Sequence, residues 1–283
     1  MDSFHAFCDQ KTREATSPRL APLETIEDHS AAFATQAIGN SWTRQYYDGP
    51  FHLPAGGTSV PFVSLVFVQS RDRNTVTDNP EDLGGGPLDK HLLYEGLSRV
   101  GVDAVLAGAR TAEGENTFFS VWHPELVALR QELGLPRHPA QIVVTGTGCI
   151  NVEASRVFNV PEVSVYVVAG PVGCRALARV ISQRTWVQLV PMTADDLRRP
   201  LECLGREHGI RRISAVGGRT TASALLDQGL VQDLCLTTAL REGGEPNTPF
   251  YAGSRPPRTM PIVRKRGADR EYPILFEHLA VQR

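Results

Sequence analysis

The chain has 283 residues, of which 41% are apolar and 21% are charged, so it can bury a sizeable core and is too apolar to be disordered. Its formal net charge of −2 gives no case for a nucleic-acid or membrane partner, and we expect a small-molecule substrate. Five scattered cysteines without a C-x-x-C pair favour a reducing, cytoplasmic compartment, and no metal site is predicted. No apolar run nears the roughly 18 residues of a membrane span, and the first residues do not resemble a signal peptide.

Residues 1–60 are expected to form an arm that packs on a main domain of residues 61–283. A helix is predicted near Ala31–Ile38. After this predicted helix come the aromatic residues Trp42, Tyr46, Tyr47 and Phe51. Such side chains are expected to be buried anchors, with a substrate pocket or a dimer contact as the alternatives.

The main domain alternates between strand and helix signals. Val63–Val68 is a continuous apolar run, typical of a strand in the middle of a covered sheet. A polar loop over 69–87 follows, and leucines at helical spacing from Leu88 then predict a helix that Gly101 closes. Further strands are predicted at 102–107, 141–145, 163–169, 186–190, 213–216, 230–239 and 272–280. Further helices are predicted between Pro124 and Gly134, at 174–181, from a Thr193/Asp196 capping box to Gly209, and from Thr220 or Thr221 to Gly229.

The order of these elements predicts the fold class. Strands separated by helices pair in parallel through right-handed crossovers, so we expect a three-layer α/β/α fold with a mostly parallel sheet. No helix separates the last two predicted strands, which indicates an antiparallel edge. The alternation within 230–239 predicts a strand exposed on one face, available for a dimer contact.

Several catalytic signatures are absent from the sequence. It has no G-x-S-x-G, H-E-x-x-H or Walker motif, no G-x-G-x-x-G after a strand, and no zinc-deaminase signature. The eight histidines are isolated and are expected at the surface or at helix ends. His208 is predicted in the last turn of its helix, where a cation suits the helix dipole.

Four small or hydroxyl-rich loops follow predicted strands, at 108–111, 145–148, 169–171 and 217–221. The carboxyl ends of parallel strands meet at one edge of an open sheet, where ligands bind. The Gly-Gly pair of the last loop allows close approach of the backbone, and the following helix start offers free N–H groups to a phosphate. A tight turn explains each loop alone, whereas their grouping predicts a nucleotide-like ligand.

Two motifs in these loops resemble a known family. Asp103–Ala112 with Glu115-Asn116, and Val216–Thr220 with Leu225–Leu234, resemble the reductase domain of the bifunctional riboflavin-biosynthesis deaminase/reductase. The resemblance covers roughly residues 60–280, leaves the arm unmatched and includes no deaminase domain. It implies a dihydrofolate reductase-like fold, NADPH as cofactor, a homodimer, and hydride transfer to a ribosylaminopyrimidine.

The resemblance also implies roles for single residues. Asp72 and Glu115 are expected to anchor the substrate or handle a proton, with exposed loop carboxylates as the alternative. The substrate contacts are expected to include Ser70, Asn116 and Phe118. The implied cofactor contacts are Gly108, Ala109, Arg110, Thr111, Thr145, Gly217, Gly218, Arg219 and Thr220.

The sequence departs from this family at four points. Val66 stands where the family has a lysine, Arg73 where it has a glycine, and Val216 where it has an acid. The apolar segment 117–122 replaces an arginine that binds the substrate phosphate. Losing cationic anchors disfavours a phosphorylated sugar as substrate. The aromatic side chains of 117–122 would suit a flat, less charged molecule, or would equally pack in the core.

The cofactor's 2′-phosphate also lacks its usual partner, because no basic residue stands beside the 145–148 loop. Arg110, Arg156 or Arg219 would have to take that role. We predict an NADPH-dependent reductase of a pteridine-like, pyrimidine-like or carbonyl substrate. The alternatives are the 5-amino-6-(5-phosphoribosylamino)uracil reductase of riboflavin synthesis, and a catalytically silent relative that binds a nucleotide or a partner protein.

Overall fold

The computed structural model describes residues 3–77, 83–193, 196–253 and 256–282. The strands are β1 (Leu23–Asp28), β2 (Thr35–Ile38), β3 (Phe51–Pro54), β4 (Phe62–Gln69), β5 (Ala104–Gly108), β6 (Ala140–Thr145), β7 (Val165–Ala169), β8 (Val187–Pro191), β9 (Arg212–Val216), β10 (Asp233–Ala239), β11 (Arg258–Gly267) and β12 (Ile274–Gln282). The α-helices are α1 (Ser3–Thr16), α2 (Ser41–Tyr46), α3 (Ser98–Val100), α4 (Ala109–Ala112), α5 (Pro124–Glu132), α6 (Pro171–Ile181), α7 (Arg198–Glu207) and α8 (Arg219–Asp227). The described residues also include two 3₁₀ turns, η1 (Ser30–Ala32) and η4 (Arg156–Phe158), and a π-helix, η3 (Leu88–Leu97).

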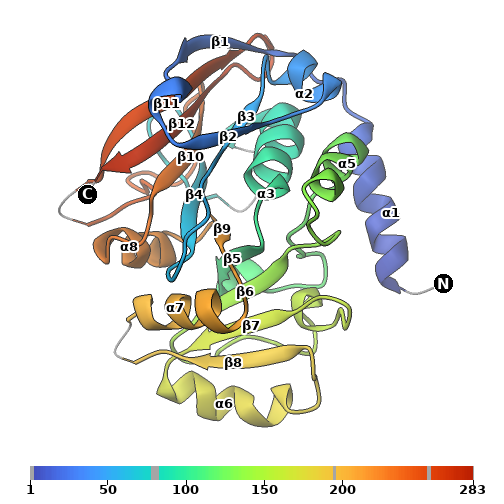
Figure 1. Cartoon of the computed structure of the whole chain (residues 1–283), viewed down its shortest axis with the longest axis vertical. Coiled ribbons are helices and arrows are strands. Elements are labelled where there is room, and N and C mark those ends of the chain that lie inside the picture. The colour runs from blue at the N-terminus through green and yellow to red at the C-terminus, as the bar shows by residue number, and fades with distance from the viewer. Residues whose placement is uncertain (1–2, 78–82, 194–195, 254–255, 283) are drawn as a thin grey trace.

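One ten-stranded sheet organises the molecule, in the order β1-β11-β12-β10-β4-β9-β5-β6-β7-β8 (Figure 1). From β10 to β8 every neighbouring pair is parallel. At the β10 end, β12, β11 and β1 continue the sheet with antiparallel pairs. The mostly parallel sheet with an antiparallel edge, predicted from the sequence, is therefore confirmed.

Two apolar cores cover the two faces of the sheet, because successive strand residues point to opposite sides. In β5, Val105 belongs to one core and Leu106 to the other. Helices α5 and α6, π-helix η3 and the arm helix α1 pack on the first face, and α7 and α8 on the second (Figure 1). This is the predicted three-layer arrangement.

The local predictions hold where the apolar pattern is strong. The run Val63–Val68 lies in β4, in the interior of the sheet. The leucine pattern forms η3 and α3, and Gly101 follows as the C-cap. In the predicted polar loop 69–87, residues 78–82 lie outside the described residues.

The prediction of an exposed edge strand at 230–239 is wrong. Strand β10 is not at an edge, because β4 and β12 pair with its two sides. It is buried along almost its whole length, because Cys235 lies in the first core and Leu234 and Leu236 lie in the second. Strand β11, which the sequence did not reveal, and β1 extend the sheet beyond β12. A dimer contact through an exposed face of 230–239 therefore has no basis, and the homodimer stays a prediction from the resemblance.

Three helix predictions also need correction. In the expected helix Ala31–Ile38, only the turn η1 is helical, because Thr35–Ile38 pairs with Phe51–Pro54 as a hairpin-like sheet. Helix α8 has Gly218 as its N-cap, so Thr220 and Thr221 lie inside the helix. Helix α7 begins after Leu197 without a side-chain cap, so the Thr193/Asp196 capping box does not form.

The N-terminal residues are integrated with the rest of the chain. Strand β1 pairs with β11, from Leu23 opposite Gly267 to Asp28 opposite Val263. Among the aromatic residues between 42 and 51, Tyr47 and Phe51 are buried, whereas Trp42 and Tyr46 are half-buried. Tyr47 packs edge-on against Phe276 of β12, with 5.9 Å between ring centroids. Among the described helices, none has the length and apolar character needed to cross a membrane.

Candidate functional site

Five neighbouring parallel strands end at the same edge of the sheet and place their loops in a row. In spatial order these strands are β4, β9, β5, β6 and β7. The segments that follow them begin at Ser70, Gly217, Ala109, Gly146 and Gly170. The structure thus brings together the loops that the sequence singled out, at the edge where open α/β sheets bind ligands.

The loops after β5 and β9 touch each other and form a glycine wall, defined here as residues 108–111 and 217–221. A Cβ atom on Gly217 would lie 3.0 Å from Thr111 Cγ2, and one on Gly108 would lie 2.8 Å from Thr221 Oγ1. Gly217 and Gly218 both have positive φ angles, 67° and 80°. Glycine at these positions permits both the backbone conformation and the close packing of the two loops. At the end of the wall, the first turn of α8 starts without a side-chain cap, which leaves N–H groups for a ligand.

Thr145 shapes the loop after β6. Its buried hydroxyl accepts a hydrogen bond from the Gly148 N–H at 2.9 Å. Gly148 in turn packs on Gly173 of α6, since an added Cβ would lie 2.9 Å from Gly173 Cα. Gly146 is exposed and has open space beside it. The loop therefore offers its backbone at Gly146, while the Thr145 side chain holds its form.

The three arginines considered for the 2′-phosphate differ in their partners. Arg219 Nε donates to the Pro249 carbonyl at 2.7 Å. The Arg156 guanidinium lies 4.2 Å from the centroid of the Phe7 ring and donates to the Glu115 carbonyl. Arg110 is exposed, and within the described part of the chain its side chain has no hydrogen bond or ion pair. Arg110 is thus the arginine whose charge is uncommitted.

Asp72 and Ser70 belong to a hydrogen-bond network that fixes the loop after β4. The Asp72 carboxylate accepts from Ser70 Oγ at 2.6 Å, from Asn74 Nδ2 at 2.6 Å, and from the Gly243 N–H at 3.3 Å. The hydrogen bond from Ser70 is the main cause that lowers the pKa of Asp72 below 3.8. An exposed carboxylate with a lowered pKa stays ionised at neutral pH, which suits loop anchoring and does not suit proton donation.

Glu115, Asn116 and Phe118 lie on the segment after α4. Glu115 and Asn116 are exposed. Phe118 is 5% exposed and packs edge-on against Phe4 of α1, with 5.0 Å between ring centroids. The arm helix α1 thus covers the aromatic cluster that could otherwise have received a flat substrate.

Asp89 is a titratable residue that the sequence analysis did not single out. It lies in the π-helix η3, a rare form that occurs often at functional sites. Burial raises the pKa of Asp89 from 3.8 to about 6, against an opposing hydrogen bond from Thr237 of β10. The signal in the sequence was a carboxylate among apolar residues at helical spacing, Leu88, Leu92 and Leu93.

A small internal cavity lies beside Asp89. The cavity has a volume of about 10 Å³, and its lining includes Asp89, Val66, Leu93 and Thr237. This volume corresponds to about one water molecule. Val66 pairs with Val216, and Val216 directly precedes Gly217. Asp89 therefore lies one strand away from the glycine wall.

A larger cavity, of about 330 Å³, lies at the opposite edge of the sheet. Its lining includes Gly229 and Val231, which precede β10, and Gln282 at the end of β12. The size of this cavity does not make it the ligand site, because open parallel sheets bind ligands at the carboxyl ends of their strands. The candidate site is therefore placed at the glycine wall.

Comparison with known proteins identifies the family. The sequence profile of the RibD C-terminal domain matches residues 61–260. The chain belongs to the RibD C-terminal domain family. It is thus a reductase-family member and an oxidoreductase, and the resemblance found in the sequence is confirmed. No curated protein sequence matches the chain.

Solved structures share the fold at low sequence identity. A pyrimidine reductase-like protein from Corynebacterium diphtheriae is 20% identical, with a TM-score of 0.65 over 79% of this chain and 92% of that one. Riboflavin biosynthesis reductase Rib7 of Saccharomyces cerevisiae is 18% identical, with a TM-score of 0.56 over 80% and 92%. RibD of Acinetobacter baumannii is 17% identical, with a TM-score of 0.59 over 80% of this chain and 59% of that longer chain. The expected α/β fold of this reductase family is confirmed.

Proposed function

We propose that this chain is an NADPH-dependent reductase of a small, flat heterocycle of the pyrimidine or pteridine type, and that Asp89 is its proton donor. The proposal rests on one juxtaposition. The glycine wall suits a dinucleotide backbone, and a buried carboxyl group with a raised pKa lies one strand away from it. Hydride transfer needs a cofactor site and a proton source close together.

The residues at the carboxyl edge suit NADPH. The N–H groups at the start of α8, behind Gly217 and Gly218, would hold a phosphate of the cofactor. The open backbone at Gly146 allows close approach of the dinucleotide. Arg110, whose charge is uncommitted, would bind the 2′-phosphate that distinguishes NADPH from NADH. A bound nicotinamide would supply the hydride.

Asp89 suits the role of proton donor better than Asp72 or Glu115. With a pKa of about 6, part of the Asp89 population keeps its proton at neutral pH, which is the range a general acid needs. Because Val66 stands where the family has a lysine, this residue adds no positive charge beside the carboxyl group to lower its pKa. Asp72 and Glu115 remain proposals for holding the loops that frame the substrate.

The apolar surroundings favour a substrate without a phosphate. Val66 and Val216, which replace charged family residues, are both buried. The segment 117–122 packs under α1 and places no arginine at the site. A second function, the 5-amino-6-(5-phosphoribosylamino)uracil reductase reaction, is favoured by membership of the RibD C-terminal domain family. We retain the homodimer and the cytoplasmic location as predictions.

Titration of the purified chain with NADPH and NADH, followed by nicotinamide fluorescence, tests the cofactor proposal. We expect NADPH to bind more tightly than NADH. Binding of neither nucleotide at sub-millimolar concentration would refute the reductase function and favour the catalytically silent relative. If NADPH binds, its oxidation with dihydrofolate or with the riboflavin precursor separates the two substrate proposals.

A further inference from the structure

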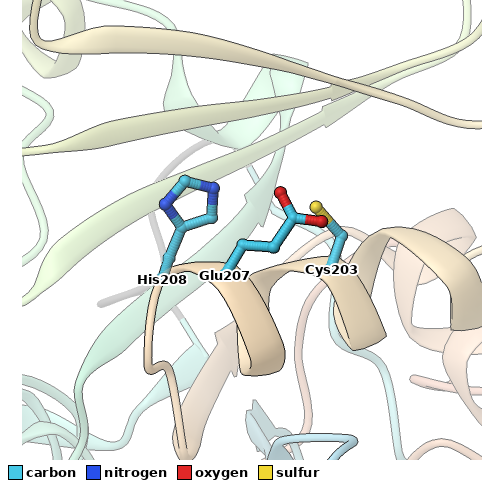
Figure 2. A group of neighbouring side chains, drawn as sticks. All are labelled: Cys203, Glu207 and His208. Carbon is cyan, nitrogen blue, oxygen red and sulfur yellow. The ribbon is translucent and has the colours of Figure 1, made fainter.

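A cluster of metal-ligating side chains lies at the end of α7. Cys203, Glu207 and His208 each offer one ligand atom, and these atoms lie within 4.8 Å of one another (Figure 2). Helix α7 leads from β8 back to the start of β9, whose other end carries Gly217. The cluster therefore lies at the edge of the sheet opposite the glycine wall, and the proposed reductase site does not use it.

The local backbone sets the positions of the three groups. Cys203 and Glu207 are four residues apart and lie on the same face of the helix. His208 is the C-cap residue, and its N–H donates to the Leu204 carbonyl at 3.2 Å. The imidazole of His208 packs on Tyr166 of β7, with 4.6 Å between ring centroids and 50° between ring planes. All three side chains extend from the same side of the helix end (Figure 2).

The charges around the cluster favour a cation. The C-terminal end of a helix carries a partial negative charge. The neighbouring Arg206 lies 3.7 Å from Glu202, so its ion pair is with that residue rather than with Glu207. The Glu207 carboxylate therefore keeps its charge available to a cation that lies between it, Cys203 and His208.

We propose that Cys203, Glu207 and His208 form a divalent-metal site that suits zinc, with a water molecule as the fourth ligand. Thiolate sulfur, imidazole nitrogen and carboxylate oxygen are the ligands that zinc takes in tetrahedral sites. Bond lengths of about 2.3 Å to sulfur and 2.0 Å to nitrogen place such ligand atoms about 3.6 Å apart. Because the present separation is at most 4.8 Å, small side-chain rotations complete the site.

Zinc binding at this site is a simple exchange. The S–H bond of Cys203 breaks, its proton passes to solvent, and a sulfur–zinc bond forms without change of oxidation state. The sequence predicted no metal site, since the spacing C-x₃-E-H is not a known zinc signature and His208 was expected only as a partner of the helix dipole. The site becomes visible only when the end of α7 is seen in three dimensions.

Cobalt and zinc titration of the full chain tests the proposal. After treatment with a chelator, we expect Co²⁺ to produce a thiolate-to-cobalt charge-transfer band that saturates at one equivalent and that Zn²⁺ abolishes. Cys203→Ser should remove this band. Glu207→Gln and His208→Gln should weaken zinc binding at least about tenfold. Cys149→Ser removes an exposed cysteine of the β6 loop and should change nothing.

Three results would overturn the site. These are the absence of a charge-transfer band in the native chain, a band that survives in Cys203→Ser, and native zinc affinity in Glu207→Gln. Glu207 is exposed, so this last variant tests the site without a risk to the core. The measurement does not depend on reductase activity, and the outcome for NADPH binding is independent of it.

Discussion

The substitution Asp89→Asn gives the sharpest prediction, because it removes a buried charge and keeps the shape of the side chain. Burial raises the pKa of Asp89 from 3.8 to about 6. Each tenfold change in proton affinity is worth 1.36 kcal/mol, so ionised Asp89 costs the fold about 3 kcal/mol. This cost is absent below about pH 4, where the carboxyl group is protonated in both the folded and the unfolded chain. It is complete above about pH 6, where the carboxyl group is ionised in both. We expect the asparagine variant to be more stable than the native chain at pH 7 by up to about 3 kcal/mol, with about half of that gain at pH 5.

Urea unfolding between pH 5 and pH 8, followed by tryptophan fluorescence, measures this difference. Asp72→Asn is the matched control with the opposite sign. Because hydrogen bonds lower the pKa of Asp72, its ionised form stabilises the fold at neutral pH, and that stabilisation is lost as pH falls through the carboxyl range. The same Asp89 variant should lose reductase turnover. An Asp89→Asn chain that is less stable than native at pH 7, or that keeps native turnover, would refute the assignment of Asp89.

Three further predictions concern the cofactor site and the arm. Gly218→Val should weaken NADPH binding at least about tenfold. The control Gly229→Val is also at positive φ but has open space around its Cβ, so it should cost about 1–2 kcal/mol of stability and leave NADPH binding unchanged. Equal NADPH affinities of the two variants, measured by fluorescence, would show that the Gly-Gly pair is only a turn. Arg110→Ala should weaken the binding of NADPH about tenfold to a hundredfold, as expected for the loss of a charge-assisted hydrogen bond, and leave the binding of NADH unchanged. Equal losses of affinity for both cofactors would contradict a contact with the 2′-phosphate. Phe7→Ala should lower the free energy of unfolding in urea by about 3–5 kcal/mol, because Phe7 is 6% exposed and packs against Trp122. A loss below about 1 kcal/mol would show that α1 is not part of the core.

The sequence predicted best those elements whose pattern is local. Strand β4 follows from an unbroken apolar run, and the helix before Gly101 follows from the spacing of its leucines. Strand β11 was missed because Arg264, Lys265 and Arg266 give it a polar sequence, although the Lys265 side chain is buried by contact with the arm. Lys265 donates to Thr25 Oγ1 at 2.7 Å, a contact across the two ends of the chain that no local pattern encodes.

The candidate site was predicted in part for the same reason. Gly217-Gly218 and Gly108 were identified from short motifs, and their contact through Thr111 and Thr221 required the strand order of the sheet. Asp89 escaped notice because its importance comes from burial beside β10 rather than from any neighbour in sequence. The sequence predicted that these loops lie at one edge of the sheet, and only the fold shows that the carboxyl group of Asp89 is buried near them.

The pairing of β1 with β11 bears on how the protein is made. Leu23 pairs with Gly267, so this edge of the sheet cannot form until residues 263–267 have left the ribosome. Contacts between such distant residues form slowly, since a long loop must close before they contribute any stability. During synthesis the segment 23–28 is therefore an unpaired strand that can associate with other chains. We expect aggregation during expression to begin there rather than at β6 and β7, whose parallel partners β5, β7, β6 and β8 follow one another closely along the sequence.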